Sequence, residues 1–256
     1  MQYKAIKLVK RPELHITPDL FETVTLETPA LVDGQILLKQ THMSLDPAMK
    51  GWMTDDRKSY IPPVELGEIM RSSGVAEVVE SRHEDFAVGD RVVGMIGWTE
   101  YAVSDGAGLN KLPPDISAEA VLCVLALPGL TAYQGLMEIG KPKAGETLVV
   151  SGAAGSVGSM VGQIARAEGL TVIGTAGSDE KCRWLEDELG FDRAINYKSD
   201  DLAEQMAEAT PEGIDLYFEN TGGPVQHVVF NRMNAHGRIV VCGMIADYNT
   251  ATPAPG

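Results

Sequence analysis

The sequence predicts an α/β fold in which a β-rich barrel domain precedes a doubly wound parallel sheet. Three observations lead to this fold class. Short β-like runs give way to helical segments near residue 120, and strands and helices alternate regularly after residue 145. A glycine-rich loop follows the first strand of that alternation. We therefore expect two domains, residues 1–118 and residues 119–256.

The first domain is rich in short β-like runs and turn residues. Residues 35–40 and 74–80 are predicted strands, and Gly89-Asp90 is a predicted turn between strands at 86–88 and 91–93. Short strands at this spacing are typical of a small β-barrel.

Two helices are expected at the start of the second domain. The Ser117 hydroxyl can cap the first helix, and the apolar residues that follow allow the helix to be buried. We expect Pro128-Gly129 to break that helix, and residues 131–139 to form the second one.

Regular alternation begins at residue 146. Residues 147–150 are continuously apolar, as buried parallel strands are, and the following segment is apolar at i, i+3, i+4 and i+7. The predicted strands are 147–150, 171–175, 193–197, 214–218 and 238–242, and the predicted helices are 156–168, 178–189, 200–209 and 225–233. A dinucleotide-binding sheet usually has about six strands. Five strands followed by a loop-like segment at 252–256 therefore predict a truncated chain whose last strand is missing.

Composition and charge exclude several classes of protein. The chain has 256 residues, 44% of them hydrophobic, and a formal net charge of −15. So acidic a chain lacks the overall electrostatic footprint of a nucleic-acid or membrane-surface protein. No uninterrupted apolar run approaches the roughly 18 residues of a membrane-spanning helix, and the N-terminus has no apolar signal core. The three widely spaced cysteines favour a reducing compartment, so we expect a cytoplasmic protein.

The glycine-rich loop predicts a nucleotide site. The strand at 147–150 runs through residues 151–158 directly into a helix, which is the context that a dinucleotide fingerprint requires. Gly155 would allow the backbone to approach a pyrophosphate, and Gly158 would allow the helix to pack closely. Ala153 occupies the first glycine position of the fingerprint. The helix N-terminus would offer free N–H groups to the phosphates.

The second strand of the alternation bears on the choice between NAD and NADP. An NAD site usually has an acidic residue at the tip of this strand, but residues 174–177 contain none. Ser178 and the acidic residues after it fit an ordinary helix start. Lys181 does not, because a cation in a first helical turn opposes the helix dipole unless it faces an anion. The 2′-phosphate of NADPH is such an anion, so we expect NADPH.

No metal site is expected. The barrel domain has no cysteine before Cys123, and its histidines have no ligand-like spacing. Two catalytic spacings occur without their usual context. Ser178 and Lys181 match an acyl-transfer motif at a helix start, and Tyr3 and Lys7 match a reductase spacing in a predicted strand.

The chain resembles the zinc-free medium-chain dehydrogenases/reductases, and among them the leukotriene hydroxydehydrogenase, prostaglandin reductase and curcumin reductase group. The most specific matches are Ser44-Leu45-Asp46-Pro47 and Ser59-Tyr60-Ile61-Pro62-Pro63. The matching segments are residues 43–53, 59–63, 88–92, 128–133, 153–158, 177–181, 196–198, 217–223 and 242–245, with Tyr248. The resemblance implies a GroES-like substrate domain, a Rossmann NADP-binding domain and a homodimer, and members of the group continue beyond the length of this chain.

The resemblance also implies roles for individual residues. Ser178, Lys181 and Tyr197 would bind the 2′-phosphate side of NADPH, and Asn220 its ribose or nicotinamide side. The pyrophosphate would lie on Gly155, Ser156, Val157 and Gly158. The loop over the nicotinamide would be Cys242, Gly243, Met244, Ile245 and Tyr248, and Thr131 would lie at the floor of the cleft.

The implied reaction is the reduction of a carbon–carbon double bond conjugated to a carbonyl, in an enone or alkenal. Hydride addition to the β-carbon leaves an enolate, whose oxygen needs a donor and whose α-carbon needs a proton. Tyr248 and Tyr60 are the candidate donors, although either could simply be a wall residue, and a ribose hydroxyl or water could supply the proton. A zinc-free quinone reductase and a non-catalytic NADPH-binding protein remain alternatives.

Overall fold

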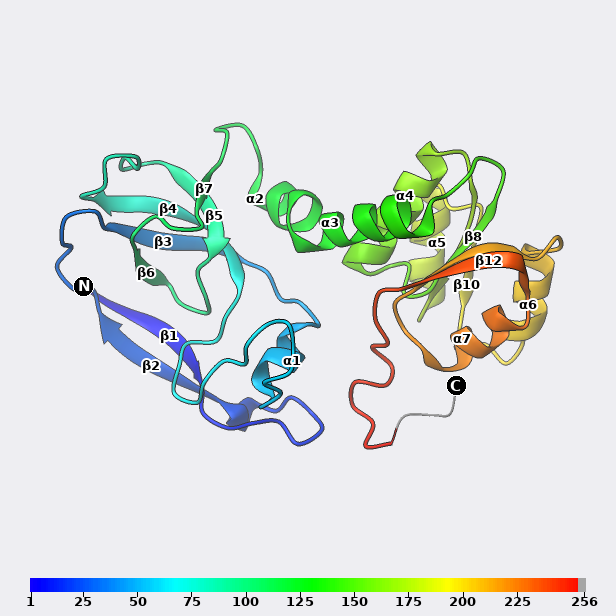
Figure 1. The fold of residues 1–256 in the computed structure, drawn as a ribbon, viewed down its shortest axis with the longest axis horizontal. Coiled ribbons are helices and arrows are strands. Elements are labelled where there is room, and N and C mark those ends of the chain that lie inside the picture. Colours follow the sequence, from blue (N-terminus) through cyan, green and yellow to red (C-terminus); the bar gives the residue numbers. More distant parts are fainter. Residues whose placement is uncertain (253–256) are drawn as a thin grey trace. The chain divides into compact units, whose positions relative to one another are not determined.

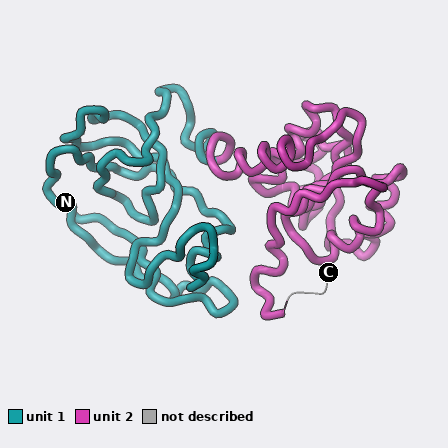
Figure 2. The backbone as a smooth tube through the Cα atoms, viewed as in Figure 1, with its two compact units in different colours: residues 1–122 teal, residues 123–256 magenta. Residues whose placement is uncertain are grey.

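The computed structural model describes residues 1–252 and consists of two compact units, Met1–Leu122 and Cys123–Gly256 (Figure 2). We call them the N-terminal and the C-terminal unit. Most of the loop expected at 252–256 lies outside the described residues, because these end at Thr252.

The N-terminal unit is built mainly from strands, as predicted (Figure 1). A five-stranded antiparallel sheet has the order β6-β3-β4-β5-β7, and β1 and β2 form a separate antiparallel pair. The strands are β1 (Gln2–Leu8), β2 (Phe21–Glu27), β3 (Ile36–Met43), β4 (Ser73–Ser81), β5 (Arg91–Met95), β6 (Tyr101–Ser104) and β7 (Asn110–Lys111). The helices in this unit are η1 (Pro18–Leu20), α1 (Met49–Met53) and α2 (Ala118–Ala120).

One predicted strand of the N-terminal unit is wrong. Residues 86–88 form no strand, although the turn that follows them is present, with Gly89 at φ 92°. Phe86 is buried in a cluster with Ile36, Val78 and Val92, so its side chain packs into the core from a loop. An apolar residue in a loop can pack as deeply as one in a strand, which is why the short run was misleading.

The helical segment from residue 118 to 140 differs in detail from the prediction. Ser117 caps α2 as expected, its Oγ accepting from the Ala120 N–H at 3.1 Å. The π-helical stretch η2 (Val121–Leu125) follows, then α3 (Leu127–Tyr133) and the π-helical stretch η3 (Gln134–Gly140). The irregularity lies at Ala126, and Pro128 stands in the first turn of α3 rather than ending a helix. Proline is tolerated there because a first-turn N–H has no partner in the helix.

This segment is also strongly apolar, although no uninterrupted apolar run within it is long. Residues Ala118–Gly140 have a mean hydropathy of 1.6 in their most apolar window, 33% of which is buried. By length and composition alone such a helix can cross a membrane, and the core helix of a water-soluble protein passes the same test.

The C-terminal unit is a doubly wound parallel sheet, which confirms the predicted fold class. The strand order is β10-β9-β8-β11-β12. The strands are β8 (Thr147–Val150), β9 (Thr171–Ala176), β10 (Arg193–Asn196), β11 (Ile214–Glu219) and β12 (Met233–Val241). The helices after α3 are α4 (Ser156–Ala167), α5 (Asp179–Asp187), α6 (Leu202–Ala209) and α7 (Gly223–Phe230). Met233, predicted as the end of a helix, begins β12 instead.

Helices cover both faces of this sheet. One cluster of buried residues joins α3, α4 and α5 to one face, and a second joins α6 and α7 to the other. Leu148 and Val150 belong to the first cluster, while Val149 belongs to the second. Successive residues of a buried strand point to opposite faces, so the continuous apolar run predicted here is the expected pattern. All five strands are parallel, so their carboxyl ends lie at one edge of the sheet.

Candidate functional site

The glycine-rich loop lies between β8 and α4, as the sequence predicts. Gly152 has φ 58°, and the Gly155 N–H donates to the Gly152 carbonyl at 3.0 Å, which closes a tight turn. A Cβ on Gly158 would lie 2.5 Å from that same carbonyl oxygen, so only glycine lets the helix start this close to the loop. Gly155 caps α4 without a side-chain hydrogen bond. The N–H groups of Ser156 and Val157 therefore begin the helix without a side-chain acceptor, as an anion site requires.

A compensating glycine explains the alanine in the fingerprint. Ala153 is fully buried, and a Cβ built on Gly174 of β9 would lie 2.9 Å from the Ala153 Cβ. The Ala153 N–H donates to the Thr175 carbonyl at 2.9 Å, which holds the loop against β9. Gly174 thus makes room for the methyl group that the usual fingerprint lacks. Sequence inspection noted Gly174 only for the absence of an acid there, because its packing partner is distant in sequence.

Ser178 and Lys181 open α5 as predicted. The Ser178 Oγ accepts from the Lys181 N–H at 3.4 Å and caps the helix. The Lys181 side chain is exposed, and within residues 1–252 its ammonium group forms no hydrogen bond or ion pair with the protein. It lines a hollow of about 460 Å³ together with Ala154 of the glycine-rich loop, and Arg183 and the acidic residues Glu180, Asp187 and Glu188 line the same hollow. The first-turn cation thus lies beside the loop without an ion pair in the described chain.

Tyr197 lies at the end of β10, next to the start of α5. Its hydroxyl would be 3.3 Å from a Cβ on Gly177, and its ring is 37% exposed. The Lys198 Nζ lies 5.9 Å from the centre of that ring, and its Cε is 3.6 Å from the same Cβ position. A second cation thus lies near Gly177 and Ser178. Sequence reasoning did not single out Lys198 as a site residue, because a lysine after a tyrosine carries no distinctive pattern.

Asn220 is fixed at the end of β11. Its Nδ2 donates to the Ser151 carbonyl at 2.7 Å, and its N–H donates to the Ser151 Oγ at 2.8 Å. Ser151 follows β8 directly, so these bonds join the carboxyl ends of two neighbouring strands. The start of the glycine-rich loop and the predicted ribose-side residue are therefore held together.

The loop after β12 is hydrogen-bonded to the end of β11. The N–H groups of Cys242 and Gly243 donate to the Glu219 carbonyl at 2.9 and 3.1 Å, and the Ile245 N–H donates to the Asn220 carbonyl at 3.2 Å. A Cβ on Gly243 would lie 2.9 Å from the Tyr248 hydroxyl, which places that hydroxyl against the strand end. Met244 is in the same loop; a Cβ on Gly222 would lie 3.3 Å from its Cε.

The remaining predicted residues are the two candidate tyrosines and Thr131. Tyr248 is 41% exposed and Tyr60 is 91% exposed, so neither hydroxyl is buried in a core. Tyr60 belongs to a loop of the N-terminal unit and Tyr248 to the C-terminal unit. Thr131 is half-buried in α3, and within residues 1–252 no hydrogen bond links its side chain to the glycine-rich loop.

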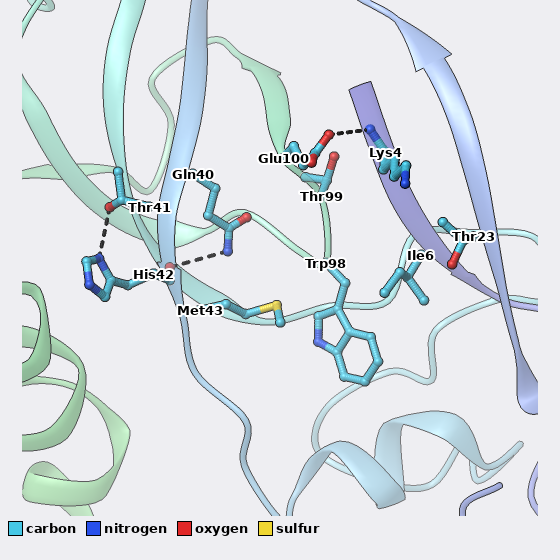
Figure 3. Close-up of a pocket in the computed structure, with 10 residues that line it drawn as sticks. All are labelled: Lys4, Ile6, Thr23, Gln40, Thr41, His42, Met43, Trp98, Thr99 and Glu100. Atoms are coloured by element: carbon cyan, nitrogen blue, oxygen red, sulfur yellow. Dashed lines mark hydrogen bonds between the residues drawn. The ribbon is translucent and has the colours of Figure 1, made fainter. Parts of the chain in front are cut away.

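The N-terminal unit has a cavity of its own, with a volume of about 370 Å³ (Figure 3). Gln40 and Trp98 are among the residues that line it, and the Gln40 Oε1 and Trp98 Nε1 atoms are buried without a hydrogen-bond partner in the described chain. The Gln40 Nε2 donates to the His42 carbonyl at 3.4 Å, which orients the amide. Neither Tyr60 nor Tyr248 lines this cavity.

Metal-ligating side chains do not gather in the described part of the chain. Within residues 1–252 no three His, Cys, Asp or Glu residues lie close enough together to hold a metal ion.

Comparisons with known proteins give the relationship of the chain. Residues 4–112 match a family described as the N-terminal domain of oxidoreductase, and residues 156–255 match a family described as zinc-binding dehydrogenase. The NADPH-dependent curcumin reductase of Escherichia coli K12 is 45% identical over 252 residues, covering 97% of this chain and 72% of the relative. Prostaglandin reductase 1 of Rattus norvegicus is 43% identical over 260 residues, covering 100% of this chain and 76% of the relative.

A solved structure agrees with these relatives. CurA from Vibrio vulnificus in complex with NADPH superimposes with a TM-score of 0.93 at 43% identity, covering 99% of this chain and 75% of that one. The similarity extends across both units and over most of each relative's length, which confirms the resemblance drawn from the sequence motifs. The chain belongs to the medium-chain dehydrogenase/reductase superfamily, within its group of curcumin and prostaglandin reductases.

Proposed function

We propose that this protein is an NADPH-dependent reductase of carbon–carbon double bonds conjugated to a carbonyl, acting on small enones or alkenals. The observation that carries the proposal is the exposed first-turn Lys181 beside the glycine-rich loop, whose ammonium group forms no ion pair within residues 1–252. A relative with 45% identity is named for NADPH-dependent reduction of curcumin, a conjugated enone, which supports the same reaction class.

The residues present fit NADPH. The glycine-rich loop leaves the N-terminus of α4 open to an anion, and Gly152 and Gly158 occupy positions that a side chain would strain or fill. Tyr197 and Lys198 lie beside Gly177, and Lys181 lies in the first turn of α5 that follows; these three side chains would bind the 2′-phosphate. Gly155, Ser156, Val157 and Gly158 would hold the pyrophosphate, and Ser178 the 2′-phosphate side. Asn220 and the loop Cys242–Tyr248 would hold the nicotinamide side, with Thr131 beneath it.

NADPH supplies a hydride when it is bound, and the protein's task is to handle the charge that follows. Hydride addition to the β-carbon of the substrate puts negative charge on the carbonyl oxygen. The Tyr248 hydroxyl, next to Gly243 at the carboxyl edge of the sheet, would donate to that enolate oxygen. Tyr60 would be a second donor or the acid that protonates the α-carbon.

The two units would divide the work. The N-terminal unit would hold the substrate and the C-terminal unit the nucleotide. A homodimer is proposed because the resemblance to this group implies one. Cys123, Cys182 and Cys242 are all free, which supports a reducing, cytoplasmic location.

The experiment is a substrate panel with matched binding measurements. Purified protein is titrated with NADPH and NADH by nicotinamide fluorescence, and NADPH oxidation is then followed with enones, alkenals and quinones. Turnover of enones with NADPH preferred over NADH is expected. Faster turnover of quinones than of every enone would replace the proposal with a quinone reductase, and NADPH binding without turnover of any acceptor would indicate a non-catalytic binding protein.

A further inference from the structure

Glu219 is a carboxylate buried in the C-terminal unit that the proposed reaction does not use. It is the last residue of β11, and none of its surface is exposed. No cation in residues 1–252 forms an ion pair with it; hydrogen-bond donors surround it instead. A buried charge of this kind is costly unless several donors satisfy it.

The donors come from three different segments. Oε1 accepts from the Ser151 hydroxyl at 2.7 Å, the Thr221 N–H at 2.8 Å and the Gly222 N–H at 2.9 Å. Oε2 accepts from the Tyr217 hydroxyl at 2.7 Å. Burial, followed by the negative charge of Glu219, raises the pKa of Tyr217, so this hydroxyl remains a donor at every ordinary pH.

The segments that Glu219 joins are those that form the candidate nucleotide site. Ser151 leads into the glycine-rich loop and also fixes Asn220 through two hydrogen bonds. The turn at Thr221 and Gly222 receives the loop after β12, where the Ala246 N–H donates to the Thr221 carbonyl at 2.9 Å. Loss of the carboxylate would free the Ser151 hydroxyl and the N–H groups of the turn together.

A second acidic residue, at the opposite end of β11, also accepts hydrogen bonds from neighbouring strands. Asp215 accepts from the Thr147 N–H at 2.9 Å and from the Asn234 Nδ2 at 2.7 Å, linking β11 to β8 and to β12. It stands at the amino end of the sheet, away from the edge at which nucleotides bind. Asp215 is therefore a matched control for the purely structural effect of removing such hydrogen bonds.

We propose that Glu219 is a positioning residue for the nucleotide site: its carboxylate sets the 220–222 turn against the start of the glycine-rich loop, and so fixes Asn220 toward NADPH. The inference rests on the proposed function, because it needs NADPH as the ligand. It adds a residue that touches neither cofactor nor substrate.

The test compares Glu219→Ala, Asp215→Ala and Glu219→Gln in the full chain. Each variant is measured for its thermal midpoint and for its NADPH dissociation constant by fluorescence, with no turnover involved. Both alanine variants should lower the midpoint by a few degrees. Only Glu219→Ala should weaken NADPH, by about tenfold or more, because only its lost acceptors face the binding edge.

Glu219→Gln should restore binding to near the wild-type value. A glutamine carbonyl in the place of Oε1 can still accept from Ser151, Thr221 and Gly222. The amide NH₂ would face the Tyr217 hydroxyl, which can turn and accept. Recovery by a neutral residue shows that hydrogen bonding, and not charge, does the positioning.

The outcomes separate the inference from the function. Wild-type protein that binds no NADPH would overturn the proposed function. Wild-type binding that Glu219→Ala and Asp215→Ala weaken equally, or not at all, would overturn the positioning role. If Glu219→Ala does not fold, Glu219→Asp replaces it: the shorter side chain keeps the charge and withdraws the carboxylate from Ser151 and the turn. Weaker NADPH binding than in Asp215→Ala supports the proposal, and binding at the wild-type level overturns it.

Discussion

Replacing Lys181 with alanine tests the cofactor assignment most directly. The ammonium group is exposed in the first turn of α5 and forms no ion pair within residues 1–252, so the variant breaks no side-chain hydrogen bond or ion pair there. We expect the fold and the NADH affinity to change little. The NADPH affinity should fall, because the 2′-phosphate loses a charge-assisted hydrogen bond.

The magnitude follows from the exposure of the site. A hydrogen bond to a charged group contributes about 1.5–3 kcal/mol, which corresponds to roughly 10- to 150-fold in the dissociation constant. Solvent screening at an exposed helix end favours the lower part of that range. Lys198, which lies near Gly177, would retain part of the attraction, so about tenfold is the expected loss.

The assay is a pair of fluorescence titrations, one with NADPH and one with NADH, at low and at high salt. Lys143→Ala is the matched control, because it removes one exposed positive charge just before β8, at the amino edge of the sheet. The control should leave both affinities unchanged, and salt should weaken NADPH binding more in wild type than in Lys181→Ala. Equal weakening of NADPH and NADH in Lys181→Ala would refute the 2′-phosphate assignment.

Three further predictions concern catalysis, the loop and stability. Tyr248→Phe and Tyr60→Phe should each lower enone turnover by about tenfold with unchanged NADPH affinity, and full turnover in the double variant would eliminate the tyrosine mechanism. Gly158→Ala should abolish measurable NADPH binding and lower the thermal midpoint, since its methyl group would lie 2.5 Å from a loop carbonyl oxygen; binding at the wild-type level would contradict this geometry. The hydrogen-bonded Arg238 lowers the pKa of Glu146, so the pair stabilises the fold above the ordinary carboxyl pKa and loses that contribution as pH falls through the lowered value. Glu146→Gln should therefore cost about 1 kcal/mol at neutral pH in urea unfolding, and a cost that persists undiminished in acid would exclude the ion pair as its source.

The misread segments show where local patterns become ambiguous. Pro128 was expected to break a helix, yet it stands in the first turn of the next one, where proline costs little. Residues 86–88 were expected to form a strand, yet they form a loop from which the Phe86 side chain packs into the hydrophobic core. In both cases the role of the residue, as a helix-boundary proline or a core aromatic, was predicted correctly, but the start or end of the neighbouring helix or strand was not. That position depends on neighbours distant in sequence.

Elements whose causes lie within a few residues of each other could be predicted from the sequence. Ser117 and Ser178 cap their helices, the apolar run at 147–150 forms a buried strand, and the glycine-rich loop turns the chain into α4. Helix caps, hydrophobic periodicity and turn glycines act within a single helical turn or strand, so they can be recognised from the local sequence. The fold class and the presence of a nucleotide site follow from them.

Contacts between segments far apart in the sequence could not be predicted, because they depend on which strands are neighbours in the sheet. The Ser151 hydroxyl reaches Glu219 across 68 positions because β8 and β11 are neighbours in the sheet, and the strand order is not written in either strand. In the same way Gly174 admits the methyl group of Ala153, because β9 lies beside the loop. Burial decided the rest: a carboxylate that would be an ordinary surface acid in an exposed strand becomes, once enclosed, the acceptor that several segments share.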